Sequence, residues 1–406
     1  MKLEMISRPK GTYVTVENKA EGAHFYIIRK GRVRVFSSIT SETSSLNRNL
    51  SAGDFFGVIS CMTERPRLQS SYVLEDCDLL VVKKHQFSFL IEKSAPLALR
   101  ILRSFSNDLR KYDEELVKRT TMSEKKTDEV KDFLDLGVYY YKKESFYNAA
   151  YIFIQFLKIF HDTPLAKTAE EYLQKIDKEY IDPTEFSSGI SRTYPDKRML
   201  FCDGEKGYEM FILEEGQVKI NKIIGGKEVL IAVLNPGDIF GEMSLLNNKN
   251  RTASAEAFGE ARCTVFNSNN FDNIFRENTA LGMRIITLLS ERIWTIYKQL
   301  DNLFFSDFGA RIYDILLTHL LKEKVPIESH RKYSFSFGQE EVFKMIGIEE
   351  EKVALAFNKI LDGDIIFVDQ GRLHCRDVSA LHKEVDFARK MEQRSRNIKS
   401  SKGLGV

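Results

Sequence analysis

The stretch FGEMSLLNNKNRTASA, residues 240–255, sets a carboxylate, a guanidinium and a glycine close together. Gly241 lets the backbone approach a ligand closely, and the N–H groups of a short helical turn after it would form an anion site. Arg251 can hold the same anion through two parallel hydrogen bonds, a geometry that suits phosphate. Glu242 would repel a phosphate unless it accepted a hydrogen bond from a sugar hydroxyl. The combination predicts a ribose-phosphate site, and the alternative is a plain ion pair on a surface loop.

A damaged copy of this phrase, FGVISCMTERPRLQSS, occupies residues 56–71. Gly57 and Arg67 keep their positions, but Val58 stands where the other copy has its carboxylate. A valine cannot accept a hydrogen bond from a sugar, and that loss costs about 1.5–3 kcal/mol, roughly tenfold to a hundredfold in affinity. We expect a degenerate domain kept for structure and dimer contacts. The alternative is a weak second site in which Gly57 and Arg67 hold a different anion.

Each phrase closes a longer repeat, residues 25–57 and 208–241, in which short apolar strands are separated by glycines. The pattern predicts two small antiparallel β-rolls with turns at Gly31 and Gly216. Helical sequence follows each roll, with apolar residues at alternating spacings of three and four, which predicts a seam for helix pairing. The seam residues are Leu102, Phe105, Leu109, Tyr112 and Leu116 after the first roll, and Ile286, Leu289, Ile293, Ile296, Leu300 and Leu303 after the second.

Between the rolls, residues 125–180 predict two or three amphipathic helices. The positions of Gly137, Tyr140, Ala149 and Phe153 resemble a tetratricopeptide repeat, in which small residues let paired helices approach and aromatics fill the gap. A single repeat cannot bury its own apolar face, so we expect this segment to dock as a structural spacer. The alternative is a binding site for a partner protein.

The C-terminal part of the chain predicts a helix, a loop, a short strand, two helices separated by a turn at Gly347, and a hairpin. The hairpin turn is expected at Gln370–Gly371. Residues 383–406 are basic and lack the periodicity of a core helix, so we expect a mobile tail.

Composition excludes several function classes. The 406 residues are 43% hydrophobic and 29% charged, with a net charge of +2, which gives no global signal for nucleic acid or membrane. The five cysteines are scattered without a C-x-x-C pair, and the seven histidines show no metal-binding spacing, so no metal is expected. The N-terminus lacks the apolar core of a signal peptide, and residues 147–160 are too short to span a bilayer. We expect a cytoplasmic protein and, in the absence of a kinase, cyclase or hydrolase signature, not an enzyme.

With PGDIFGE before it and the spacing from Glu242 to Arg251, the phrase at 240–255 resembles the phosphate-binding cassette of cyclic-nucleotide-binding domains. The resemblance implies that Glu242 binds the ribose 2′-hydroxyl and Arg251 the cyclic phosphate. Backbone groups near Gly241, Met243 and Ser244, and the hydroxyl of Thr252, would complete the site. The resemblance favours cAMP as regulatory ligand. The alternative is cGMP, because a threonine after the arginine can bond the guanine amino group.

The stretch MIGIEEEKVALAFNKILDGDII resembles the turn, recognition helix and following strand of the winged helix-turn-helix in Crp/Fnr regulators. The resemblance implies that this second helix enters the major groove of double-stranded DNA. The chain departs from the pattern at residues 349–351, three adjacent glutamates, which suit a helix N-terminus but oppose phosphates. The candidate DNA-binding residues are Lys352, Lys359 and Arg372. The alternative is a winged helix turned into a protein-interaction surface.

The expected fold is therefore α+β: two β-roll (jelly-roll) cyclic-nucleotide-binding domains joined by a helical spacer and followed by a winged helix-turn-helix. The expected function is a cyclic-nucleotide sensor of the Crp/Fnr type acting as a transcriptional regulator, with a cyclic-nucleotide-dependent protein scaffold as the alternative. We expect the helix from about Leu281 to Phe304 to pair either in a homodimer or with its counterpart in an intrachain pseudo-dimer. The expected domains are residues 1–124 (degenerate first roll), 125–180 (spacer), 181–306 (second roll), 307–382 (winged helix) and 383–406 (basic tail).

Overall fold

The chain folds into two compact units that interleave along the sequence in the computed structural model. One unit contains residues 1–86, 111–120 and 290–406, and the other contains residues 87–110 and 121–289. The structure describes residues 3–20, 23–37, 47–93, 95–120, 128–181, 190–224, 227–242, 244, 250–267, 279–346 and 350–402.

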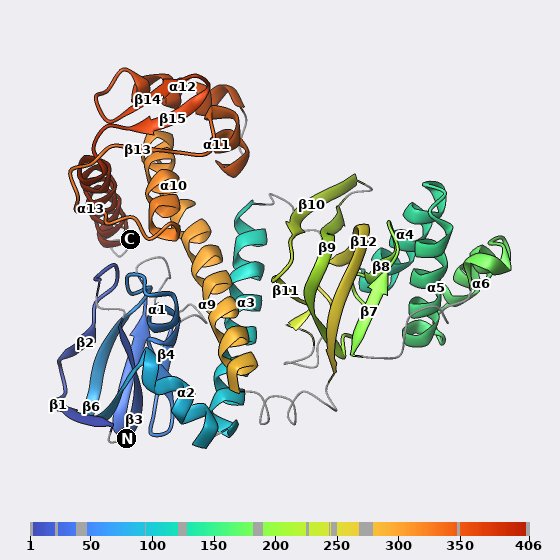
Figure 1. The fold of residues 1–406 in the computed structure, drawn as a ribbon, viewed down its shortest axis with the longest axis horizontal. Helices are drawn as coiled ribbons and strands as arrows, with labels where there is room; N and C mark the ends of the chain where they lie inside the picture. Colours follow the sequence, from blue (N-terminus) through green and yellow to red (C-terminus); the bar gives the residue numbers. More distant parts are fainter. Residues whose placement is uncertain are drawn as a thin grey trace. The chain divides into compact units, whose positions relative to one another are not determined.

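The first roll is a six-stranded antiparallel sheet built on two long strands, β3 and β6. The strand order is β1-β6-β3-β4 (Figure 1). In addition, β2 pairs with β6 and β5 pairs with β3. Alternating apolar residues such as Ile28, Val33 and Leu79 fill its core because successive side chains of a strand point to opposite faces. The strands are β1 (Glu4–Arg8), β2 (Tyr13–Thr15), β3 (His24–Phe36), β4 (Arg48–Leu50), β5 (Phe55–Phe56) and β6 (Ser70–Lys83).

The second roll repeats this topology strand for strand. Its order is β10-β9-β12-β7, with β8 on β12 and β11 on β9. Both predicted β-rolls are thus present as antiparallel sheets. The strands are β7 (Ser191–Tyr194), β8 (Met199–Phe201), β9 (Glu209–Ile224), β10 (Lys227–Leu234), β11 (Ile239–Phe240) and β12 (Ser254–Asn267).

The expected turns at Gly31 and Gly216 are wrong. Both glycines lie inside continuous strands, β3 and β9, at points where the pairing with β6 or β12 shifts register. Each has a positive φ, +88° and +79°, which is typical of a β-bulge. A Cβ would overlap the carbonyl of Asp76 or Glu260 on the facing strand, so a close backbone approach explains these glycines better than a chain reversal.

A helix follows each roll, as the seams predict. After the first roll come α2 (Lys84–Lys93) and α3 (Ala95–Thr120), and after the second comes α9 (Thr279–Asn302). Most seam residues are buried, including Phe105 and Ile293. Tyr112 of α3 packs edge to face on Tyr297 of α9, with ring centroids 5.8 Å apart. The two seams therefore touch within one chain.

The segment between the rolls forms α4 (Glu129–Lys142), α5 (Phe146–Phe160) and α6 (Ala166–Gln174), with a short 3-10 turn at Lys178–Tyr180. The missing side chain of Gly137 admits the ring of Phe153, because a Cβ would lie 2.5 Å from that ring. Met199 and Cys202 of the second roll share the core of these helices. The segment therefore docks on the second roll, as its unburied apolar face requires.

The C-terminal module places its helices against a three-stranded sheet of order β13-β15-β14. Gln370 and Gly371 connect β14 to β15 and both have positive φ, +47° and +76°, which confirms the predicted hairpin turn. The expected turn at Gly347 lies outside the described residues. The elements are α10 (Phe308–Lys322), β13 (Tyr333–Ser334), α11 (Gln339–Ile346), α12 (Glu350–Leu361), β14 (Ile366–Asp369) and β15 (Arg372–Cys375).

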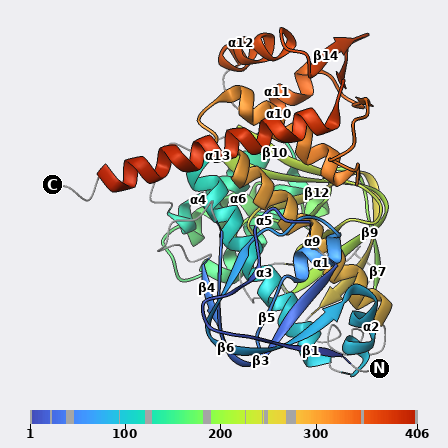
Figure 2. The same cartoon turned by 90° about the vertical axis from the view of Figure 1, so that its left-hand side faces the viewer.

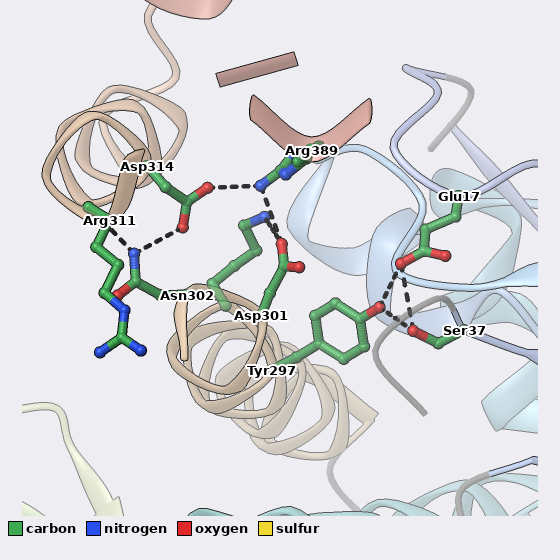
Figure 3. Close-up of polar contacts among 9 residues, drawn as sticks. Glu17, Ser37, Tyr297, Asp301, Asn302, Arg311, Asp314 and Arg389 are labelled. Atoms are coloured by element: carbon green, nitrogen blue, oxygen red, sulfur yellow. Dashed lines mark hydrogen bonds and ion pairs between the residues drawn. The ribbon is translucent and has the colours of Figure 1, made fainter. Parts of the chain in front are cut away.

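The mobile tail expected at residues 383–406 is wrong up to Lys402. Residues Val378–Lys402 form a single helix, α13, which packs on α10 (Figure 2). Val385 is fully buried there, and Arg389 bonds Asp301 of α9 and Asp314 of α10 (Figure 3). The sequence pattern looked polar because a buried ion pair takes the place that an apolar residue would hold in a core helix.

Candidate ligand site in the second roll

The predicted cassette lies between β11 and β12 of the second roll. Gly241, directly after β11, has φ of +74°, and Arg251 donates a hydrogen bond from Nη1 to its carbonyl oxygen at 2.6 Å. A Cβ on Gly241 would lie only 2.6 Å from the same Nη1. The glycine therefore makes room for the guanidinium as well as for the sharp turn.

Arg251 is a buried cation, 5% exposed. Its guanidinium carbon lies 4.1 Å from the centroid of the Phe201 ring, a cation–π arrangement. Its Nε has no hydrogen-bond partner among the described parts of the chain. Burial lowers the pKa of Arg251, and nearby carboxylates, Glu205 foremost and Glu242 among them, oppose that shift. Such a cation is suited to an anionic ligand because it has already lost most of its water.

The other predicted residues divide into three groups. Glu242 is 0% exposed, and its charge acts on Arg251. Ser244 is also buried, and its Cβ and Cζ of Arg251 both lie within 3 Å of where a Cβ on Gly207 would be. Thr252 is exposed, and its carbonyl accepts a hydrogen bond from Nζ of Lys222 at 3.3 Å. Met243 lies outside the described residues.

Two residues of the site were missed from the sequence. Gly207 faces the cassette, where a Cβ would overlap the Cβ of Ser244 and lie 2.8 Å from Cζ of Arg251. Glu205 is buried, and its backbone carbonyl accepts a hydrogen bond of 2.8 Å from the backbone N–H of Arg251. Both belong to the short loop between β8 and β9, DGEKG, whose repeated glycines were the available signal.

The first roll builds the same frame around Arg67. Its Nη1 donates to the carbonyl of Gly57 at 3.2 Å, and a Cβ on Gly57 would lie 2.6 Å from that nitrogen. Val58 is buried at the place of Glu242, as the first residue of α1 (Val58–Thr63). The backbone N–H of Arg67 donates to the backbone carbonyl of Lys19, as that of Arg251 does to Glu205, so Lys19 occupies the position of Glu205. Lys19 is exposed. The first pocket thus lacks both carboxylates of the second.

The first cassette is also a dock for α9 and α10. Arg65 stacks over the ring of Trp294, 4.4 Å from its centroid, and forms an ion pair with Glu291. It also donates to the carbonyls of Leu321 and Lys322 at 3.3 Å, where α10 ends. In the other unit, Nη2 of Arg110 on α3 donates at 3.3 Å to the carbonyl of Asn250, next to Arg251.

The candidate DNA-binding residues lie on two elements of the C-terminal module. Lys359 is exposed near the end of α12, and Arg372 is exposed at the start of β15. Lys352 belongs to α12, but its side chain and those of the adjacent glutamates lie outside the described residues. Leu355 of α12 is 68% exposed.

No helix in the described part of the chain is long and apolar enough to cross a bilayer. No group of three or more histidine, cysteine, aspartate or glutamate side chains among those residues could hold a metal ion.

Comparison with known proteins identifies the repeated unit. The family model for the cyclic nucleotide-binding domain matches residues 5–94 and 191–278. The chain is 26% identical to the cyclic AMP receptor protein of Thermus thermophilus over 197 residues, 48% of this chain and 88% of that protein. It is 25% identical to a CRP-like cAMP-activated global transcriptional regulator of Mycobacterium tuberculosis over 161 residues, 39% of this chain and 72% of that protein. The crystal structure of the Thermus thermophilus catabolite activator protein is similar over 50% of this chain and 92% of that one, with 23% identity and a TM-score of 0.28.

Proposed function

Because the chain is a Crp-type cyclic-nucleotide-binding protein with two copies of the domain, we propose that it is a cAMP-responsive transcriptional regulator whose second roll holds the ligand. The observation that carries this proposal is that Glu242 and Arg251 are both buried, with the Arg251 guanidinium within 3 Å of where a Cβ on Gly207 or on Gly241 would lie. Arg251 would bind the cyclic phosphate, and Glu242 would accept a hydrogen bond from the ribose 2′-hydroxyl. The backbone at Gly241 to Ser244, which includes Met243, and the Thr252 hydroxyl would complete the site.

The choice of cAMP draws on the relatives, whose names record a cyclic AMP receptor and cAMP-activated regulators. cGMP remains the rival ligand, since Thr252 could bond a guanine amino group. The first roll, without Glu242 or Glu205 equivalents, would serve as the structural partner of α9 rather than as a second nucleotide site.

We propose that the helices that follow the rolls, α3 and α9, pair within one chain. The contact of Tyr112 with Tyr297 favours this pairing over a homodimer through α9. Nucleotide binding would shift α9 between two arrangements, which requires the ligand to bind one of them better.

The output would be a winged helix-turn-helix formed by residues 307–382, with Lys352, Lys359 and Arg372 facing double-stranded DNA. A protein-binding scaffold is the second candidate, and the three adjacent glutamates at residues 349–351, which oppose phosphates, favour it. Duplex retention in the presence of cAMP, falling steeply as salt rises, would support the regulator. Failure to retain either specific or bulk DNA, with and without cAMP, would leave the scaffold as the better proposal.

Two matched substitutions test the ligand site by calorimetry with cAMP and cGMP. Arg251→Ala should abolish binding, because the phosphate loses its buried cation. Arg67→Ala removes the equivalent arginine of the first roll and should leave the affinity within about twofold. Binding that survives Arg251→Ala but is lost in Arg67→Ala would reverse the assignment of the two rolls.

A further inference from the structure

Asn148 joins the helix α5 to the second roll through its side-chain amide. Asn148 donates from Nδ2 to the carbonyl of Lys197 at 2.9 Å and accepts the N–H of Met199 at 3.0 Å. These two bonds fix α5 against the start of β8. Tyr151 lies three positions further along the helix and therefore on the same face.

Tyr151 reaches a carboxylate in the nucleotide site. Its hydroxyl donates to Oε2 of Glu205 at 2.8 Å. The same oxygen lies 3.2 Å from the N–H of Cys202 and 3.3 Å from its thiol. Burial raises the pKa of Glu205, which is 7% exposed, while the charge of Arg251 and then the hydrogen bond from Tyr151 oppose that shift. Tyr151 is thus among the donors that favour the ionised carboxylate.

Glu205 is tied to Arg251 through both backbone and charge. The Arg251 N–H donates to the carbonyl of Glu205, and the N–H of Gly204 donates to the carbonyl of Arg251 at 3.0 Å. Of the groups that favour the charged form of Arg251, Glu205 has the largest effect. The first roll has Lys19 at the position of Glu205, so the connection from Tyr151 through Glu205 to Arg251 belongs to the second roll.

We propose that Tyr151 is a positioning residue of the nucleotide site, and that through Glu205 the helical segment α4–α6 sets the affinity of the second roll for its cyclic nucleotide. This inference rests on the proposed function. A movement of α5 relative to β8 would remove the Tyr151 hydrogen bond from Glu205. It would thereby change the position and charge of the carboxylate that balances Arg251. By linkage, bound nucleotide would stabilise the docking of α5 by the same free energy.

The test compares Tyr151→Phe with Tyr139→Phe. Tyr139, on α4 of the same segment, also donates to a carboxylate of the second roll, Glu228 at 3.4 Å, but makes no contact with Glu205. In calorimetry with cAMP, Tyr151→Phe should weaken binding about fivefold to tenfold. This is at or below the low end of the loss for a hydrogen bond to a charged group, because the Cys202 donors remain. Tyr139→Phe should stay within about twofold.

The pH dependence of cAMP affinity distinguishes a positioning role of Tyr151 from a general destabilisation of the fold. The groups that face Glu205 are Tyr151 from α5, Cys202 after β8 and Arg251 before β12. Loss of the Tyr151 donor leaves the charged form of Glu205 less favoured. The fall in cAMP affinity at low pH should therefore begin at a higher pH in Tyr151→Phe than in the wild type, and Tyr139→Phe should follow the wild type.

A second variant, Glu205→Gln, keeps the inference testable if Tyr151→Phe folds poorly. It should weaken cAMP binding at neutral pH, and adding Tyr151→Phe to it should cost little more, because both act through one carboxylate. Wild-type affinity in both Tyr151→Phe and Glu205→Gln would overturn the inference and leave the proposed function standing. A wild-type protein that binds neither cAMP nor cGMP would instead overturn the proposed function, and the inference with it.

Discussion

Replacing Arg389 with methionine removes a charge that joins three helices. Arg389 of α13 donates from Nη2 to Asp301 of α9 at 2.9 Å and to Asp314 of α10 at 2.6 Å (Figure 3). Burial alone would lower the pKa of Arg389, but the carboxylates of Asp301 and Asp314 raise it above its usual range. Methionine keeps most of the side-chain length and apolar packing, so the substitution isolates the charge.

The expected cost follows from what remains around each carboxylate. Asp314, 1% exposed, keeps the amide of Asn302 at 3.1 Å, and Asp301 keeps Nζ of Lys298 at 2.8 Å. Breaking a buried ion pair costs about 3–5 kcal/mol. Because Lys298 still compensates Asp301, we expect the lower figure, about 3 kcal/mol, for the docking of α13. This corresponds to roughly a hundredfold in the local opening equilibrium.

Native-state hydrogen exchange measures this opening directly, since a chain of several domains has no single unfolding free energy. Backbone amides of α13 near Val385 should exchange roughly a hundredfold faster in Arg389→Met. The control is Arg394→Met, an exposed arginine on the same helix, which should exchange like the wild type. Adding Asp314→Asn to Arg389→Met should recover part of the loss, because it removes the unpaired charge. Wild-type protection in Arg389→Met, or no recovery in the double variant, would refute the role assigned to this ion pair.

The remaining predictions concern the rolls. Burial raises the pKa of Glu256 to about 7 from 4.5, so its contribution to stability is present below pH 4.5 and is lost as pH rises toward 7. The free energy of local opening of β12, measured by native-state hydrogen exchange from pH 5 to 8, should therefore fall less in Glu256→Gln than in the wild type, and equal slopes would contradict this. Gly241→Ala should weaken cAMP binding at least tenfold in calorimetry by displacing Arg251. Gly259→Ala is the control, because Gly259 has a similar φ of +75° and no atom within 4 Å of an added Cβ, and it should leave cAMP binding unchanged. Equal losses of affinity in the two variants would mean that backbone strain alone causes the effect. Arg65→Ala should change the fluorescence of Trp294, the single tryptophan of the chain, because it removes the cation over the ring. An unchanged spectrum would mean that the first cassette does not hold α9 through Arg65.

Local patterns identified the parts of this protein that depend on near neighbours. The glycine and charge spacing around Gly241 and Arg251 predicted that the two lie at one site, because the hydrogen bond from Arg251 to Gly241 joins residues only ten positions apart. The spacing of apolar residues predicted the helices α3 and α9, because one buried face imposes a period of 3.6 residues. The substitution of Val58 for a carboxylate needed only the comparison of one repeat with the other.

Features that depend on distant residues were missed or misassigned. Gly31 and Gly216 suggested turns, and only the facing strand, which would overlap a Cβ, shows that they are bulges. Glu205 resembled an ordinary loop residue because its partner Tyr151 is 54 positions away on another element. Arg389 suggested a solvated tail because its partner Asp301 is 88 positions away.

By itself, then, the sequence determined the two rolls, the helices that follow them and the proximity of Gly241 to Arg251, since each depends on the pattern of residues along a strand, a turn or a helix. The tertiary structure alone decided which carboxylate balances Arg251 and what holds α13. The physical reason is desolvation: a charge is stable in the interior only beside its partner, and the fold, not the spacing along the chain, brings those partners together.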